Sequence, residues 1–387
     1  MVDFTLTDEQ RDIRSLAHEF AAKEIRPHAA RHDADSSWPA AIVERAWRLG
    51  LMNAHIPEDY GGPGLGFFAG CLIGEELGWG CSGIATSLMS NGLAAAPVLM
   101  AGSDELKKRY LRMLTDEPRL ASFCLTEPEA GSDVASMRTR AVRHGDTYVL
   151  NGSKCFITNG SHASWYTVFA KTEPDAGPLG ISAFVVPRDT PGVVVERKED
   201  KLGQRASDTA LVSFTEVEVP AANLLGAENA GFDLAMATFD RTRPAVAAVA
   251  VGIASAAFEF ARDYARKRVQ FGVPIAMHQG IQFMVADMAT KVEAARLLTW
   301  KSAMLLEQGK RSKLASSHAK RFAADTAMEV ATDAVQIYGG HGVMKDYPVE
   351  KLLRDAKIMQ IYEGTSQIQR VVIAREVLAP RRSGSPG

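Results

Sequence analysis

The spacing of apolar residues divides the chain into a helical region, a strand-rich region and a second helical region. The first begins with a capping box formed by Thr7 and Gln10, followed by an apolar helix face (Ile13, Leu16, Ala17 and Phe20). Further helices are predicted over 39–50 and, after a Pro/Gly turn at 56–66, through Leu114. We expect an N-terminal all-α domain over residues 1–120.

Runs of β-branched and aromatic residues follow from about Ala121. Strands are predicted within 148–150, 153–158, 165–171, 181–186, 193–197 and 211–219. Asn151-Gly152 suits a type I′ turn, so 148–158 is predicted to be a hairpin. A middle β-domain over 121–231 is expected.

The helical period returns near Gly231, with long stretches at 244–268, 279–308, 313–340 and 347–378. These predict a four-helix-bundle domain over 232–387, with a disordered tail from Pro380 to Gly387. The fold class is therefore α+β: an N-terminal helical domain, a central β-domain and a C-terminal helical bundle.

Composition excludes several classes of function. The 387 residues carry a net charge of −2, which argues against a nucleic-acid or membrane-surface binder. The uncharged runs 77–103 and 244–258 predict buried helices rather than membrane spans, so no membrane insertion is expected. Four widely separated cysteines and an N-terminus without a targeting pattern favour a reduced, cytoplasmic setting.

Two motifs are interpreted as coincidental. Gly64 to Ala69 matches the dinucleotide-binding fingerprint, but no strand precedes it, so a turn is predicted. His28 and His32 have the spacing of zinc ligands without a catalytic Glu or a third ligand, so no metal site is expected.

The segment Ile361 to Gln367 places one carboxylate, Glu363, at the joint between two amphipathic helices. Gly364 is expected to end the first helix in a left-handed conformation. Ser366 with Gln369 fits a capping box for the second helix, and Thr365 is a competing cap. Apolar neighbours are expected to raise the pKa of Glu363, as suits a general base. Because a Glu near a helix end is usually a solvated charge, this motif requires support from the rest of the chain.

Several other loops combine glycines with polar or aromatic residues. Thr126 to Asp133 offers hydroxyls and backbone amides, and Phe156 to Gly160 offers a flat ring and a hydroxyl. Together they suit a planar aromatic cofactor with one apolar wall and several polar edges. Arg268 to Gly272, His278-Gln279 and the glycine-rich break Gln336 to Gly342 are further candidates for ligand contacts.

In these motifs the chain resembles the acyl-CoA dehydrogenase family, most closely its short- and medium-chain members. The resemblance covers Phe4 to Leu378 and includes the α, β, α order. Its specific elements are 125–133, 156–160, 239–244, 268–272, 336–342 and 362–367.

The resemblance implies FAD held between the β-domain and the C-terminal bundle. The positions implied to line it within one chain are Phe123, Leu125, Thr126, Ser132, Phe156, Ile157 and Thr158, with Thr365 and Gln367 near its phosphates. Those implied to reach the FAD of a neighbouring subunit are Arg268, Phe271, Gln279, Gln336, Ile337, Gly339 and Gly340. A homotetramer, a dimer of dimers, is implied.

The implied reaction is α,β-dehydrogenation of an acyl-CoA to a trans-2-enoyl-CoA. Glu363 would take the α-proton and flavin N5 the β-hydride, and the Glu363 N–H with a ribityl hydroxyl would polarise the thioester. Substrate contacts are implied at Ser132, Asp240, Arg243, Tyr362 and Gly364. Electrons would pass to an electron-transfer flavoprotein.

One position departs from the family pattern, because many relatives carry Trp where this chain has Phe156. Phe keeps the apolar wall but lacks the indole N–H, which leaves the details of electron exit open. The alternatives are an acyl-CoA oxidase, which usually has an extra C-terminal domain, and a nitroalkane-oxidase-like enzyme, which would carry Asp as its base. A catalytically silent flavin-binding relative is a third, although retention of Glu363 argues against it.

Overall fold

The computed structural model describes residues 5–310 and 312–379, so the tail predicted to be disordered lies outside the described residues. The N-terminal helices are α1 (Asp8–Phe20), α2 (Arg26–Asp35), α3 (Ala40–Arg48), α4 (Gly66–Ala101), α5 (Asp104–Leu106) and α6 (Arg112–Asp116). The predicted capping box begins α1: the Thr7 side chain accepts from the Gln10 N–H, and the Gln10 side chain accepts from the Thr7 N–H. In the Gly64–Ala69 segment, Gly64 and Leu65 lead into α4 and the remaining residues begin that helix, with no strand before it in the described chain.

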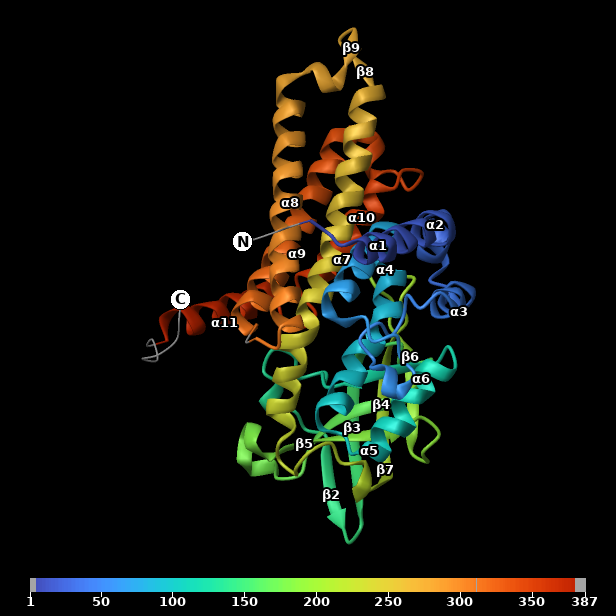
Figure 1. Ribbon diagram of the computed structural model, residues 1–387, viewed down its shortest axis with the longest axis vertical. Helices are drawn as coiled ribbons and strands as arrows, with labels where there is room; N and C mark the ends of the chain where they lie inside the picture. Colours follow the sequence, from blue (N-terminus) through green and yellow to red (C-terminus); the bar gives the residue numbers. More distant parts are fainter. Residues whose placement is uncertain (1–4, 311, 380–387) are drawn as a thin grey trace.

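Seven strands form one mixed sheet at the lower end of the molecule (Figure 1). They are β1 (Leu120–Cys124), β2 (Arg140–His144), β3 (Thr147–Thr158), β4 (Ala163–Lys171), β5 (Ile181–Pro187), β6 (Val193–Lys198) and β7 (Thr209–Pro220). Their order is β1-β4-β2-β3-β7-β6, with β5 also paired to β4. The β1–β4 pair is parallel, whereas β3–β7 and β4–β5 are antiparallel.

The predicted hairpin at Asn151-Gly152 is wrong, because β3 runs through both residues as one strand. Asn151 pairs with Arg140 of β2, and Gly152 pairs with Phe214 of β7 beside a register shift. The turn lies instead at Gly145-Asp146, between the paired residues His144 and Thr147. Partners on both sides hold β3 extended, so long-range pairing overrides the local turn preference.

The C-terminal region is a helical bundle, as predicted. Its elements are α7 (Gly231–Lys267), α8 (Gln279–Glu307), α9 (Lys313–Tyr338), α10 (Val349–Met359) and α11 (Ser366–Leu378). A two-stranded tip of β8 (Val269–Gln270) and β9 (Val273–Pro274) joins α7 to α8 at the upper end in Figure 1. The stretch 347–378 is divided into α10 and α11 by the turn that carries Glu363.

Helices α4 and α7 contain the two uncharged runs and pack against each other. Both are long and apolar enough to cross a membrane, but 56% and 78% of their most apolar windows are buried inside the protein. A Cβ on Gly252 would lie 2.2 Å from the carbonyl oxygen of Glu75, so the two backbones are in close contact there. The prediction of buried helices is therefore confirmed, and this contact fixes one wall of the site described next.

Candidate active site

The turn at residues 360–365 is held in a conformation that side chains resist. Glu363 has φ 51° and Gly364 has φ 90°, so both residues are left-handed. Helix α10 ends at Met359, before Gly364, and the Thr365 side chain caps α11 by accepting from the Ile368 N–H at 3.1 Å. The capping box predicted for Ser366 and Gln369 is therefore wrong, and the competing cap Thr365 is confirmed.

Gln369 and Ser366 are occupied elsewhere, which explains why the box does not form. The Gln369 amide donates to the carbonyl oxygens of Glu363 at 3.3 Å and Gly364 at 3.1 Å. The Ser366 hydroxyl donates to a carboxylate oxygen of Asp325 at 2.8 Å. These tertiary contacts replace the local cap and fix the turn to the bundle.

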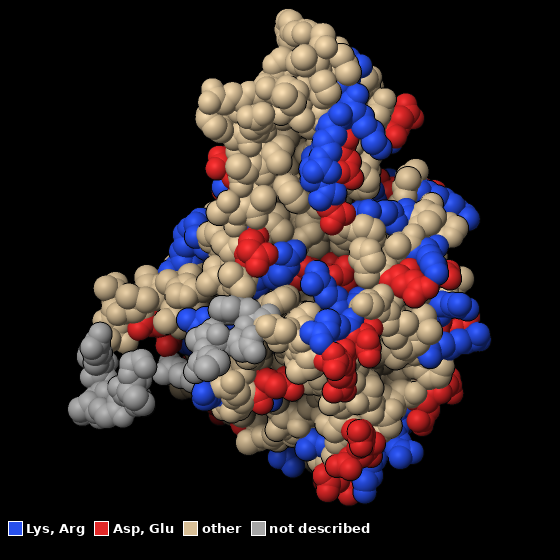
Figure 2. All heavy atoms as spheres, turned by 45° about the horizontal axis from the view of Figure 1, so that its top comes forward, with Lys and Arg blue, Asp and Glu red and all other residues tan. Residues whose placement is uncertain are grey.

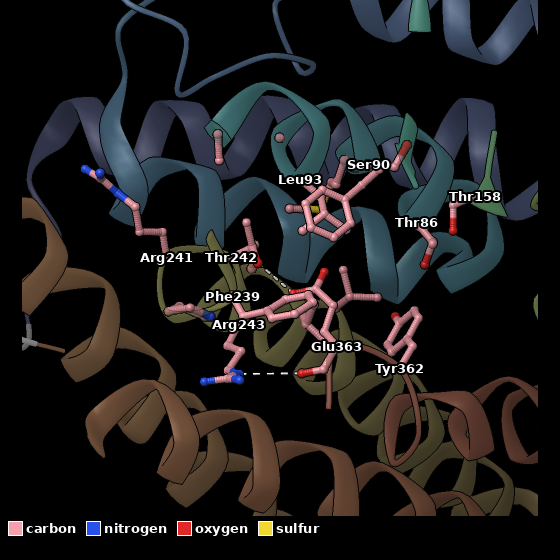
Figure 3. Close-up of a pocket in the computed structure, with 18 of the residues that line it drawn as sticks. Thr86, Ser90, Leu93, Thr158, Phe239, Arg241, Thr242, Arg243, Tyr362 and Glu363 are labelled. Atoms are coloured by element: carbon pink, nitrogen blue, oxygen red, sulfur yellow. Dashed lines mark hydrogen bonds between the residues drawn. The ribbon is translucent and has the colours of Figure 1, made fainter. Parts of the chain in front are cut away.

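The Glu363 carboxyl lies against α7. Its Oε2 accepts a hydrogen bond of 2.7 Å from the Thr242 hydroxyl, and Figure 3 shows both side chains facing one another. Burial raises the pKa of this carboxyl, while Thr242 and the charges of Arg243 and Lys320 act in the opposite direction. Protein surrounds the group, yet it keeps some surface open to a cavity. A carboxylate in this environment is suited to take a proton from a bound ligand.

Arg243 connects the base to a second carboxylate. Its Nη1 donates to Asp240 Oδ1 at 2.8 Å, and its Nε lies 3.5 Å from the Glu363 carbonyl oxygen. Only 4% of Arg243 is exposed, and burial lowers the pKa of its guanidinium, although Asp240 and Glu363 oppose that change. Buried Arg243 and half-buried Asp240 therefore form a hydrogen-bonded pair beside the Glu363 turn.

A cavity of about 690 Å³ lies between α4, α7, the sheet and this turn. It brings together the predicted residues Phe123, Leu125, Thr126, Ser132, Phe156, Ile157, Thr158, Arg243, Tyr362, Glu363, Gly364 and Thr365. Its wall from α4 includes Thr86, Met89, Ser90 and Leu93. The cavity thus has apolar walls, with hydroxyls of Thr126, Thr158 and Ser90 among its polar groups.

The loop after β1 is anchored by a buried ion pair. Lys154, which is fully buried, donates to the Leu125 carbonyl oxygen at 3.0 Å and to Glu127 Oε1 at 2.7 Å. The Glu127 carboxylate also accepts from the backbone N–H groups of Arg138 and Thr139. Because Leu125 and Thr126 line the cavity, this pair fixes the wall that a planar cofactor would contact.

The arrangement fits a flavin. Leu125 and Ile157 supply apolar wall, and Thr126 and Thr158 supply hydroxyls for the polar edge of a heterocycle. Phe156 has φ 58° and is 65% exposed beside the cavity, which leaves its ring available to a ligand.

Other predicted residues lie away from the cavity. Arg268 and Phe271 are at the β8–β9 tip, Gln279 begins α8, and the set Gln336, Ile337, Gly339 and Gly340 is at the end of α9. Gln367 lines a separate surface pocket with Lys291 and Asp325. The family resemblance implies that most of these residues contact the FAD of a neighbouring subunit, and their roles stay predictions.

Sequence reasoning missed two residues that contact the turn directly. Thr242 lies within the Asp-Arg-Thr-Arg-Pro motif, so its neighbours Asp240 and Arg243 were a signal for it. Lys320 lies in an ordinary-looking part of α9, and its Nζ donates to the Gly364 carbonyl oxygen at 2.7 Å. No local pattern marks Lys320, because its partner is distant in sequence.

Comparison with known proteins agrees with this geometry. Residues 7–117, 122–217 and 229–378 match the N-terminal, middle and C-terminal domain models of acyl-CoA dehydrogenase. An acyl-CoA dehydrogenase of Bacillus subtilis is 47% identical, over 96% of this chain and 99% of its own length. A cyclohex-1-ene-1-carbonyl-CoA dehydrogenase of Geobacter metallireducens is 48% identical, over 97% of this chain and 99% of its own.

A solved structure extends the agreement to the fold. Butyryl-CoA dehydrogenase from Megasphaera elsdenii superposes with a TM-score of 0.95 at 42% identity, covering 97% of this chain and all of that one. Full-length identity, the three domain models and the shared fold thus lead to one conclusion: the chain belongs to the acyl-CoA dehydrogenase family and is an FAD-dependent oxidoreductase of acyl-CoA thioesters.

Proposed function

We propose that Glu363 removes the α-proton of an acyl-CoA thioester, giving a trans-2-enoyl-CoA. Bound FAD would supply the acceptor for the hydride that leaves the β-carbon. The observation that carries the proposal is the position of the Glu363 carboxyl: it opens on the same cavity as the flavin-type loops 123–126 and 156–158. A base and a hydride acceptor are needed on the two adjacent carbons of the substrate, and this cavity provides for both.

The electrostatics of the Glu363 carboxyl support its role as a base. Burial raises the pKa of Glu363, which makes the carboxylate a stronger base, while the Thr242 hydroxyl keeps the ionised form stable. Burial therefore strengthens Glu363 as a base, and the opposing contacts keep its ionised form accessible.

The backbone of Glu363 supports a second role. Its N–H has no hydrogen-bond acceptor within the described chain. The carbonyl oxygens of Glu363 and Gly364, in contrast, each accept hydrogen bonds from side chains. A free N–H at the cavity is suited to polarise the thioester carbonyl and so acidify the α-carbon. We assign it that role, together with a ribityl hydroxyl of the cofactor.

For the substrate we propose contacts at Ser132, Asp240, Arg243, Tyr362 and Gly364. The apolar α4 wall at Met89 and Leu93 suits an acyl chain, and water excluded there strengthens the hydrogen bonds at the thioester. Relatives of similar identity include dehydrogenases of two quite different acyl groups, butyryl-CoA and cyclohex-1-ene-1-carbonyl-CoA. Fatty-acid and branched-acyl breakdown are therefore both included in the proposal.

The assembly we propose is a homotetramer in which Arg268, Phe271, Gln279, Gln336, Ile337, Gly339 and Gly340 reach a neighbour's FAD, with Gln367 near the phosphates of its own. Phe271 is 94% exposed, and Met277 and Phe283 nearby are 66% and 61% exposed. Figure 2 shows few charged side chains at the upper end of the visible face, where this tip lies. Such an apolar tip suits burial against another subunit.

We further propose an electron-transfer flavoprotein as acceptor, a cytoplasmic location, and domain boundaries after residues 120 and 231. The four cysteines are buried and unpaired, which suits a reducing compartment.

Anaerobic titration tests the proposal. The purified protein is expected to be yellow, and a straight-chain acyl-CoA is expected to bleach the flavin. Glu363→Gln should keep FAD bound and stop bleaching, whereas Glu218→Gln, on an exposed face of β7, should behave as wild type. Absence of bleaching with every short- and medium-chain acyl-CoA would refute the straight-chain assignment, and normal reduction of the Glu363 variant would remove that residue from its role.

A further inference from the structure

Lys320 is a fully buried cation behind the Glu363 turn. It lies on α9 with 0% of its surface exposed, and its Nζ donates to the Gly364 carbonyl oxygen at 2.7 Å. No carboxylate lies within ion-pair distance of it in the described chain. A buried ammonium without such a partner is costly, so the placement of Lys320 needs a physical explanation.

The nearby charges identify the group that its charge affects. Facing Lys320 are Glu363 from the turn, Arg243 from α7 and Asp325 from α9 itself. Asp325 is already engaged by Ser366, Gln360 and Arg370, and Arg243 is paired with Asp240. Glu363 is therefore the anion that its charge most directly stabilises.

The hydrogen bond has a mechanical consequence as well. The backbone of the left-handed pair Glu363 and Gly364 is held at its carbonyl oxygens by Arg243, Gln369 and Lys320, which come from α7, α11 and α9. Lys320 makes the shortest of these contacts. Removing the Lys320 ammonium frees the peptide after Gly364. The Glu363 side chain and N–H are then no longer held in one direction.

We propose that Lys320 is a positioning residue for the base: it fixes the Glu363–Gly364 turn through the Gly364 carbonyl and favours the ionised Glu363 carboxylate by its charge. This inference rests on the proposed function of Glu363. Lys320 does not line the cavity, so it acts on the reaction through Glu363 and its turn.

The sign of the pH effect follows from the charges. Burial lowers the pKa of Lys320 to about 7, with Glu363 and Asp325 raising it and Arg243 lowering it. Below that pH the ammonium is charged and favours the carboxylate form of Glu363. Without it the carboxylate is less stable, so the rising limb of the bleaching rate against pH moves to higher pH.

The test compares Lys320→Met holoenzyme with wild type in anaerobic stopped-flow bleaching by butyryl-CoA across pH. FAD content and melting temperature are measured in parallel. We expect the variant to retain FAD and to show the rising limb shifted to higher pH. Its bleaching rate at neutral pH should fall by about tenfold or more, the equivalent of one charged hydrogen bond. Lys313→Met is the control, because Lys313 lies two turns earlier on α9 and is 42% exposed; it should match wild type.

Two further variants keep the test decisive. Lys320→Arg retains charge and donors and should keep the rising limb at its wild-type pH. If Lys320→Met gives no folded holoenzyme, Lys320→Gln, which lacks the charge, should show the same shift. An unchanged rate and pH profile with FAD bound overturns the inference, as does loss of folded holoenzyme in both uncharged variants. Failure of the wild-type protein itself to bleach would instead refute the proposed function.

Discussion

The Thr242–Glu363 hydrogen bond offers the most direct test of how the base is tuned. Replacing Thr242 with Val keeps the side-chain shape and removes the 2.7 Å hydrogen bond to Oε2. Hydrogen bonds to charged groups contribute about 1.5–3 kcal/mol. Because a neutral carboxyl also accepts hydrogen bonds, we take the lower end, about 1.5 kcal/mol, which corresponds to roughly tenfold in rate.

The direction of the pKa change follows from which form of Glu363 depends more strongly on the hydrogen bond. The ionised carboxylate is destabilised, so the pKa of Glu363, already raised by burial, rises further in Thr242→Val. At pH values below the wild-type pKa the bleaching rate should fall about tenfold, because fewer molecules carry the base form. Above the new pKa both enzymes are ionised, and the deficit should disappear.

The assay is the pH dependence of flavin bleaching by butyryl-CoA in anaerobic stopped flow, with Thr242→Ser as the control that retains the hydroxyl. Two results would contradict the reasoning. Superimposable profiles would show that the hydrogen bond does not tune the base, and an equal deficit at every pH would show that Thr242 only orients it.

Two further predictions follow from the anchoring contacts. Lys154→Met leaves Glu127 as a buried carboxylate without its cation, which should cost about 3–5 kcal/mol of unfolding free energy and release FAD. Melting and flavin content measure the two effects. A Lys154→Met/Glu127→Gln double variant as unstable as the single variant would contradict this. Gly364→Ala places a Cβ 2.6 Å from the Gln369 amide nitrogen at φ 90°, so bleaching should slow by about tenfold or more while FAD stays bound. Gly145→Ala, at φ 61° with nothing within 4 Å, is the matched control, and equal bleaching rates in the two variants would argue against a special role for the turn.

Some of the fold could be predicted because its signals are local. The capping box at Thr7 and the helical periods before and after residue 363 depend only on neighbours three or four positions away. The same holds for the order of helical and strand-rich regions. Strands β1 and β2 were not predicted, and the turn at Asn151-Gly152 was placed wrongly, because strand pairing depends on distant partners.

The sequence by itself determined that one carboxylate, Glu363, lies at a helix joint within a family-like set of motifs. Only the tertiary structure decided what surrounds that carboxylate. Thr242 and Lys320 are 121 and 44 residues away from the positions they contact, and neither has a local signature. The helices α7 and α9 bring a hydroxyl and a buried ammonium to the turn, and their effect on the base depends on distance and burial, which periodicity does not encode.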